Sequence, residues 1–376
     1  MAPGSNLFAH YGYAQADIDG KIDRVWKTIF EGPEEERFYF EAQDETGFLM
    51  DTGNFDVRTE GLSYGMMMAL LMDRKDIFDR LWKWSRLNMS MTDGPQAGYF
   101  AWSCAPDGRK NAQGAAPDGE EYFIMVLIFA SRKWGNGTDI FDYAAEARTL
   151  MKRCLHGPLP MWNKENTYIR FVPDCEFTDP SYHLPHFYEQ FVEFSADSDS
   201  AFWKQAAKES RKFFTVCCHP ATGFAPEYSY YDGTPNPWGP PEGHGYFYSD
   251  AYRVAATIGL DALWCGKTPE LSRIAANMQA FFVDIPVEDY MTYEIDGTVV
   301  PQKALHPVGL LATLAQSSLA VWDDPDPAVA ANAEKIVRRF WDTPLRTGER
   351  RYYDNCLYFF ALFALGGKCT AYQAGR

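Results

Sequence analysis

The chain has 376 residues, 46% of them hydrophobic and 23% charged, a composition typical of a globular protein rather than a disordered one. Its formal net charge of −16 argues against a nucleic-acid partner, because neutralising phosphate groups requires basic surface. A neutral or cationic small molecule suits this charge better.

The first residues, MAPGSNLFAHYGYAQ, contain no basic segment followed by an apolar one, so we predict no signal peptide and a cytoplasmic protein. The longest apolar runs, such as 122–130, fall well short of the roughly 20 residues that a membrane span needs, so no membrane partner is expected. The eight cysteines form neither a CxxC pair nor a Cys/His cluster, and no nucleotide-binding glycine motif occurs. We therefore expect free thiols, no metal and no cofactor.

From the N-terminus onward, two kinds of helix alternate. The first kind is amphipathic, and its earliest example has apolar residues at the spacing i, i+4, i+7, i+8 and i+11 (Ile18, Ile22, Val25, Trp26 and Ile29). Similar stripes lie at 77–82, 271–281 and 329–340, with weaker ones at 139–155 and 198–216. Thr268-Pro269 and Asp326-Pro327 each indicate a helix start, with an N-cap residue followed by proline at the first helical position.

The second kind of helix is apolar nearly all round and must be buried on all sides. Five segments have this character: GMMMALLM (65–72), YFIMVLIFA (122–130), AYRVAATIGLDALW (251–264), VGLLATLAQSSLAVW (308–322) and CLYFFALFALGG (356–367). A sixth, 181–194, is more polar, and Pro185 is expected to interrupt it.

The two kinds alternate through six cycles, with inner helices starting near residues 60, 118, 181, 250, 306 and 354. This architectural repeat predicts an all-α fold, an (α/α)6 barrel of six inner and six outer helices. Two separate helical domains are the alternative, but no Pro/Gly/Ser-rich linker divides the chain, so we expect a single domain, 1–376.

The loops distinguish one end of this barrel. Inner helices lead to outer ones through short connections, whereas the returns are long, roughly 91–117, 156–180, 217–249 and 283–305. Asp-Gly turns at 107–108, 232–233 and 296–297 predict short β-hairpins there. Long loops in a compact domain are usually functional, so the cleft should lie at this end, above the N-termini of the inner helices.

Polar residues cluster at those N-termini: Glu60, Asp118, Asp179 with Tyr182, Asp250 with Arg253, His306, and Asp354. An acid at a helix start is most often a cap, and that interpretation stays open for Asp118 and Asp354. Thr59 would cap the first inner helix better than Glu60, and Ser249 could cap in place of Asp250, which would leave both acids free to face the cleft.

Two facing carboxylates suit glycoside hydrolysis, in which one protonates the leaving oxygen while the other activates water or attacks the sugar. The acid needs a raised pKa, which helix N-termini oppose, so the acid should be the more enclosed of the pair. Glu60, next to an apolar helix, fits this role better than Asp250, which has polar neighbours.

Aromatic residues make up 16% of the chain, and flat rings stack on sugar faces. The candidates for such contacts lie in the long loops: Tyr99, Phe100, Trp102, Tyr228, Tyr230, Tyr231, Trp238, Tyr246, Phe247 and Tyr248. His306 is the only histidine at an inner-helix start, although a lone histidine is usually structural and Pro307 could simply mark the first helical position.

Four segments resemble glycoside hydrolase family 8: TEGLSYGMMMAL (59–70), PDGEEYF (117–123), DPSYHLPHFYEQF (179–191) and YSDAYRVAATIGLD (249–261). The resemblance implies an inverting hydrolase on an (α/α)6 barrel, with Glu60 as general acid and Asp250 as general base. It also implies that Asp118 holds the sugar at the cleavage point, with Arg253 and Tyr182 in support. An inverting enzyme should separate its two carboxyl groups by about 6.5–9.5 Å.

Within that family, Leu305-His306-Pro307 is similar to a segment that blocks the cleft in members releasing xylose from the reducing end of xylooligosaccharides. The resemblance therefore implies a xylooligosaccharide substrate, and we expect a monomer. The alternatives are an endo-acting relative on xylan, β-glucan or chitosan, a sugar epimerase, and a non-catalytic sugar-binding barrel. The epimerase would need a second histidine beside His306, and the binding protein would be expected to lack one of the two acids.

Overall fold

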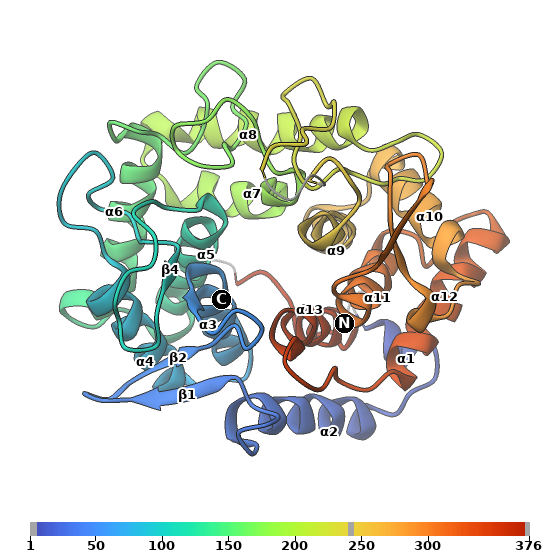
Figure 1. Cartoon of the computed structure of the whole chain (residues 1–376), viewed down its shortest axis with the longest axis horizontal. Coiled ribbons are helices and arrows are strands. Elements are labelled where there is room, and N and C mark those ends of the chain that lie inside the picture. The colour runs from blue at the N-terminus through green and yellow to red at the C-terminus, as the bar shows by residue number, and fades with distance from the viewer. Residues whose placement is uncertain (1–5, 240–243, 373–376) are drawn as a thin grey trace.

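Two concentric rings of helices build the protein (Figure 1), and the computed structural model describes residues 6–239 and 244–372. The inner ring consists of α3 (Thr59–Leu71), α5 (Pro117–Trp134), α7 (Pro185–Phe194), α9 (Arg253–Cys265), α11 (Pro307–Ser317) and α13 (Arg351–Leu365). Each inner helix packs on the next, and α13 packs on α3, so the ring closes. The outer ring consists of α2 (Gln15–Trp26), α4 (Lys75–Trp84), α6 (Tyr143–His156), α8 (Asp197–Cys217), α10 (Pro269–Phe282) and α12 (Pro327–Asp342). The predicted (α/α)6 barrel is confirmed.

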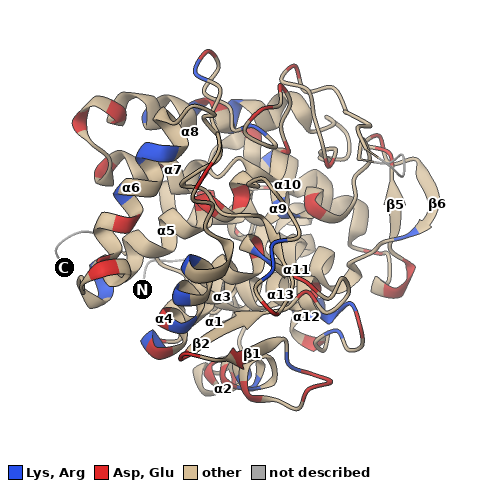
Figure 2. Cartoon of the chain, turned by 60° about the vertical axis from the view of Figure 1, so that its left-hand side comes forward, with Lys and Arg blue, Asp and Glu red and all other residues tan. Residues whose placement is uncertain are grey.

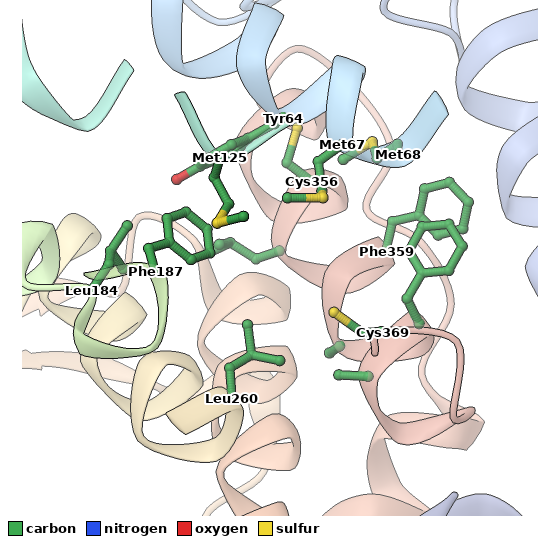
Figure 3. Close-up of a cluster of buried hydrophobic side chains, with 14 of the residues drawn as sticks. Tyr64, Met67, Met68, Met125, Leu184, Phe187, Leu260, Cys356, Phe359 and Cys369 are labelled. Atoms are coloured by element: carbon green, nitrogen blue, oxygen red, sulfur yellow. The ribbon is translucent and has the colours of Figure 1, made fainter. Parts of the chain in front are cut away.

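The inner helices hold the core of the barrel. Figure 3 shows side chains from several of them meeting inside the ring, among them Tyr64, Met67, Met125, Phe187 and Leu260, all of which are buried. Burying a side chain of this size stabilises the fold by about 1.5–3 kcal/mol, and methionine adapts well to irregular gaps. Charged residues are instead spread over the outer helices and the loops (Figure 2). Within 6–239 and 244–372, no helix combines the length and the apolar character that crossing a membrane requires.

Three inner helices start at positions that differ from the sequence-based expectation. Pro185 does not interrupt α7, because it is the first residue of that helix, where its missing N–H breaks no hydrogen bond. A separate 3-10 turn, Pro180–Tyr182, precedes it. Another 3-10 turn, Ser249–Tyr252, runs directly into α9. Helix α13 begins at residue 351, three residues before the expected start.

The predicted caps are only partly confirmed. Asp326 caps α12 by accepting a hydrogen bond from the backbone N–H of Ala328. Thr268 makes no such bond at the start of α10. The expected capping by Thr59 and Ser249 is wrong, because Thr59 is already the first residue of α3 and Ser249 lies inside its 3-10 turn.

Three two-stranded antiparallel sheets lie in segments that lead into inner helices: β1 (Tyr39–Ala42) with β2 (Thr46–Leu49), β3 (Val57–Arg58) with β4 (Ser103–Cys104), and β5 (Met291–Tyr293) with β6 (Val299–Lys303). The Asp-Gly pair at 296–297 forms the turn between β5 and β6, as predicted. The pairs at 107–108 and 232–233 also lie in tight hydrogen-bonded turns. The β1–β2 hairpin was not predicted.

Short helical segments complete the chain: α1 (Leu7–His10), π-helical turns at Lys27–Glu31 and Ser85–Met89, and 3-10 turns at Asp139–Phe141, Val287–Asp289 and Ser318–Ala320.

Candidate active site

Four acidic residues surround the side chain of Arg253 at the cleft end of the barrel. Its guanidinium is buried, and Nη1 lies 3.1 Å from Oε2 of Glu60 and 3.3 Å from Oδ2 of Asp118. Nη2 lies 3.4 Å from Oδ2 of Asp250 and 3.7 Å from Oδ2 of Asp179. Because one planar guanidinium links them, the nearest oxygens of Glu60 and Asp250 are at most about 9 Å apart, which is compatible with the separation in inverting enzymes.

Glu60, in the first turn of α3, is held from two sides. Besides Arg253, it contacts Tyr352, whose hydroxyl donates a hydrogen bond of 2.9 Å to Oε1. The neighbouring Gly61 makes this contact possible, because a Cβ there would collide with the Tyr352 hydroxyl. Burial raises the pKa of Glu60 to about 8, against the lowering effect of Arg253 and with further raising by Asp118 and Asp250. Burial thus outweighs the helix N-terminus, which favours the ionised carboxylate.

Asp250 is the more open acid of the pair. Its side chain is 27% exposed, compared with 13% for Glu60, so the acid assigned as proton donor is the more enclosed one. The Tyr353 hydroxyl donates a 3.0 Å hydrogen bond to Oδ1 of Asp250. The preceding residue, Ser249, has φ +38°, a left-handed conformation that a serine rarely adopts. Such strained backbone is common beside functional groups.

Asp118 reaches the cleft because α5 starts close against α3. Gly119 permits this approach, since a Cβ at that position would collide with the Thr59 side chain. Oδ1 of Asp118 accepts a 2.9 Å hydrogen bond from the N–H of Gly119, and Oδ2 faces Arg253. Burial raises the pKa of Asp118 to about 6, against the lowering effect of Arg253.

Other neighbours fix the guanidinium of Arg253. Nε donates to Oγ of Ser181 at 3.1 Å, and Nη1 donates to the hydroxyl of Tyr64 at 3.0 Å. The ring of Tyr182 lies 5.5 Å from the guanidinium carbon, within cation–π distance. Tyr182 is therefore placed beside Arg253, as the sequence suggested.

Two pockets meet at the acid pair, because Glu60 and Asp250 line both. The larger pocket, of about 920 Å³, has an aromatic lining of Trp102, Phe171, Tyr182, Tyr228 and Trp238. The smaller pocket, of about 530 Å³, is lined mainly by polar residues: Asp51, Asn54, Arg58, Ser249, Leu305, His306, Arg350, Tyr352 and Tyr353.

The loop aromatics proposed as sugar contacts separate into two groups. Trp102, Tyr228 and Trp238 line the larger pocket. The expectation is wrong for Tyr99, Phe100 and Phe247, which are buried in the hydrophobic core. The other four line neither pocket: Tyr230, Tyr231, Tyr246 and Tyr248. Phe171 was missed, because nothing in the sequence distinguishes it from the core phenylalanines.

His306 lies at the N-terminal end of α11 and lines the smaller pocket. Its Nδ1 is 2.8 Å from Oδ2 of Asp354, a fully buried carboxylate. Asp354 was considered as a cap of its own helix, but it instead contacts His306, Arg346 and the N–H of Gly309.

Sequence reasoning also missed the role of the first turn of α13. Tyr352, Tyr353 and Asp354 are consecutive, and they hydrogen-bond to Glu60, Asp250 and His306 respectively. The preceding Arg351 anchors this turn, because its guanidinium donates to carbonyl oxygens of residues 34, 36, 37 and 348. The only sequence signal was an acid at the expected helix start.

A closed helical barrel that holds two acids between two pockets is compatible with glycoside hydrolysis, a reaction that uses a pair of carboxyl groups. A family model described as glycosyl hydrolases family 8 matches residues 36–362. The chain therefore belongs to glycoside hydrolase family 8.

Named enzymes and a solved structure resemble the chain over nearly its full length. It is 54% identical to the reducing end xylose-releasing exo-oligoxylanase of Halalkalibacterium halodurans, covering 96% of this chain and 92% of the relative. It is 50% identical to the corresponding enzyme of Paenibacillus barcinonensis, covering 98% and 96%. A crystal structure of a mutant reducing-end-xylose releasing exo-oligoxylanase complexed with xylobiose superposes with a TM-score of 0.92, at 54% identity and 96% coverage of both chains.

Proposed function

We propose that this single-domain barrel is a glycoside hydrolase that releases xylose from the reducing end of β-1,4-xylooligosaccharides with inversion of configuration. The observation that carries the proposal is the position of Glu60 and Asp250 at the junction of two unequal pockets. The likeness to enzymes named for reducing-end xylose release supports this substrate class.

In the proposed reaction, Glu60 acts as general acid. Its raised pKa keeps the carboxyl group protonated near neutral pH, so it transfers that proton to the glycosidic oxygen as the bond to the anomeric carbon breaks. Asp250 acts as general base and accepts a proton from the water that attacks the opposite face of the sugar. The β-linkage thus yields free xylose and a shortened chain whose new reducing end is the α-anomer.

The two pockets receive the two parts of the substrate. In the proposal, the larger aromatic pocket binds the part of the chain that keeps its anomeric carbon, with Asp118, Trp102 and Tyr182 beside the sugar at the cleavage point. Arg253 keeps Glu60, Asp118 and Asp250 in position around this sugar. The smaller pocket takes the leaving xylose, and His306 with the adjoining segment closes it against a longer leaving group.

We also propose that one chain forms the complete site and works as a monomer in the cytoplasm. The eight cysteines are all free, which suits a reducing compartment. Size-exclusion chromatography with light scattering tests the monomer, and fractionation of producing cells tests the compartment.

Incubation with xylotriose carrying an isotopic label at its reducing-end sugar tests the function. We expect labelled xylose and unlabelled xylobiose, with the α-anomer of xylobiose appearing first by NMR. Labelled xylobiose would contradict reducing-end release, and the β-anomer would contradict inversion. An endo-acting enzyme would instead cut longer chains internally, and a binding protein would release nothing.

A further inference from the structure

His306 shares a hydrogen bond with Asp354, a residue that the proposed mechanism does not use. The His306 side chain is 10% exposed and lines the smaller pocket, while its Nδ1 lies 2.8 Å from Oδ2 of Asp354. Its other nitrogen, Nε2, has no hydrogen-bond partner among the residues that the structure describes. The ring of Tyr353 packs beside the imidazole, with centroids 4.7 Å apart, and limits its rotation.

The surroundings of Asp354 determine which imidazole nitrogen carries the proton. Oδ1 accepts a 2.8 Å hydrogen bond from the N–H of Gly309, and Oδ2 accepts one of 2.5 Å from Nη1 of Arg346. A carboxylate surrounded by donors acts only as an acceptor, so the proton shared with His306 lies on Nδ1. A neutral imidazole protonated at Nδ1 has its lone pair on Nε2.

We propose that Asp354 is a positioning residue for the leaving sugar: by accepting the Nδ1 proton of His306, it fixes the tautomer whose Nε2 accepts a hydrogen bond from a hydroxyl group of the sugar in the smaller pocket. This inference rests on the proposed function, which assigns that pocket to the leaving xylose. The proton stays on His306 throughout, so Asp354 contributes orientation rather than proton transfer.

Two substrates separate this role from a general structural one. Xylotriose places a leaving xylose in the smaller pocket, whereas β-xylobiosyl fluoride loses only fluoride and brings no sugar there. Asp354→Ala removes the carboxylate that accepts the Nδ1 proton, so kcat/KM for xylotriose should fall about tenfold or more relative to that for the fluoride. His306→Ala should cause the same selective loss, and combining the two substitutions should cause no further loss.

Asp261→Ala is the matched control, because Asp261 is also a buried aspartate paired with an arginine, Arg211, but it lines neither pocket. It should leave the ratio of the two substrate activities unchanged. Equal losses on both substrates for Asp354→Ala, or additive losses with His306→Ala, would overturn the inference.

NMR of the unmodified protein tests the tautomer directly and does not depend on the folding of a variant. After 15N-labelling of histidine, the His306 signals are identified by their disappearance in His306→Ala. We expect a proton on Nδ1 and an unprotonated Nε2, and a proton on Nε2, whether alone or together with one on Nδ1, would overturn the inference. If the proposed function itself were wrong, the wild-type protein would release no xylose from xylotriose. That result differs from every outcome that would contradict only the role of Asp354.

Discussion

The larger pocket and the smaller pocket, on either side of Glu60 and Asp250, differ in chemistry as well as in volume. Aromatic rings dominate the larger pocket, among them Trp102 and Trp238, which remain 39% and 57% exposed. The smaller pocket instead presents carboxylates, guanidinium groups, hydroxyls and an imidazole. Stacking tolerates many sugar positions, whereas directed hydrogen bonds depend strongly on position.

This contrast between the pockets suggests how one cleft binds a chain of sugars yet releases a single sugar. Contacts with the larger pocket can accumulate along the retained part of the substrate, and this remote binding contributes to catalysis at the cleaved bond. In the proposed function, the smaller pocket selects the leaving group by fit and hydrogen bonding. Four variants test this division, in order of decreasing effect.

Removing the proton donor between the pockets should have the largest effect. We expect Glu60→Gln to lower kcat/KM on xylotriose by about 10²- to 10⁴-fold, the usual contribution of general acid catalysis, with the melting temperature nearly unchanged. Steady-state kinetics and thermal unfolding measure both. Glu189→Gln, at an arginine-paired glutamate on α7 that lines neither pocket, is the control. A nearly fully active Glu60→Gln enzyme would refute the acid assignment.

Truncating an aromatic side chain in the larger pocket should have the next largest effect. Trp238→Ala removes a stacking surface worth about 1–2 kcal/mol, so we expect kcat/KM on xylotriose to fall about five- to thirtyfold. Tyr230→Ala is the control, because Tyr230 is 47% exposed and lines neither pocket. If both variants behave alike, stacking in the larger pocket does not contribute to binding.

Opening the closed end of the smaller pocket should change which products are released. The double substitution Leu305→Ala with His306→Ala removes the side chains of the closing segment, so longer leaving groups should fit. With xylopentaose, we expect the ratio of xylobiose to xylose among the first products to rise several-fold, as measured by chromatography. Val299→Ala, at an exposed site on β6, should leave the ratio unchanged. An unaltered ratio in the double variant would show that this segment does not close the pocket.

The smallest expected effect is a shift in the pH dependence of kcat/KM. Glu60 must be protonated to act, so activity should be present below its pKa of about 8 and be lost as the pH rises through that value. The Tyr352 hydroxyl donates to the carboxylate and thereby favours its ionised form, so Tyr352→Phe should raise the pKa of Glu60. We expect the alkaline limb of kcat/KM to move up by as much as about one pH unit.

Tyr353→Phe is the matched control for this pH shift, because Tyr353 donates to Asp250 instead of Glu60. Its alkaline limb should stay where the wild-type limb lies. A limb in Tyr352→Phe that moves to lower pH would contradict the role assigned to the Tyr352 hydroxyl.

The barrel was predictable because helices buried on all sides leave a strong sequence pattern. Segments such as 122–130 and 356–367 are apolar all round, and the structure places both in the inner ring. The β1–β2 hairpin left no such pattern. Its turn uses Asp44 and Glu45 at φ +57° and +54°, positions where Asn or Gly usually marks a turn.

The candidate site was predictable only in part. Acids at helix starts converge because the barrel brings those starts together, and Glu60, Asp118, Asp179 and Asp250 meet at Arg253. Tyr352 and Tyr353 could not be recognised, because tyrosines in an apolar helix resemble ordinary core residues until their hydroxyl partners are known. The partner of His306 could not be predicted either, because Asp354 lies 48 residues further along the chain.

The anchoring of α13 has a consequence for synthesis. Tyr352, Tyr353 and Asp354 belong to the last helix of the ring to leave the ribosome, and Arg351 ties that helix to backbone made near the beginning. A nascent chain ending before residue 351 contains the proposed acid and base and Arg253, but it lacks the hydroxyl groups of Tyr352 and Tyr353 that hold the two carboxyl groups. Catalytic competence should therefore arise late in translation, when the last inner helix joins the first.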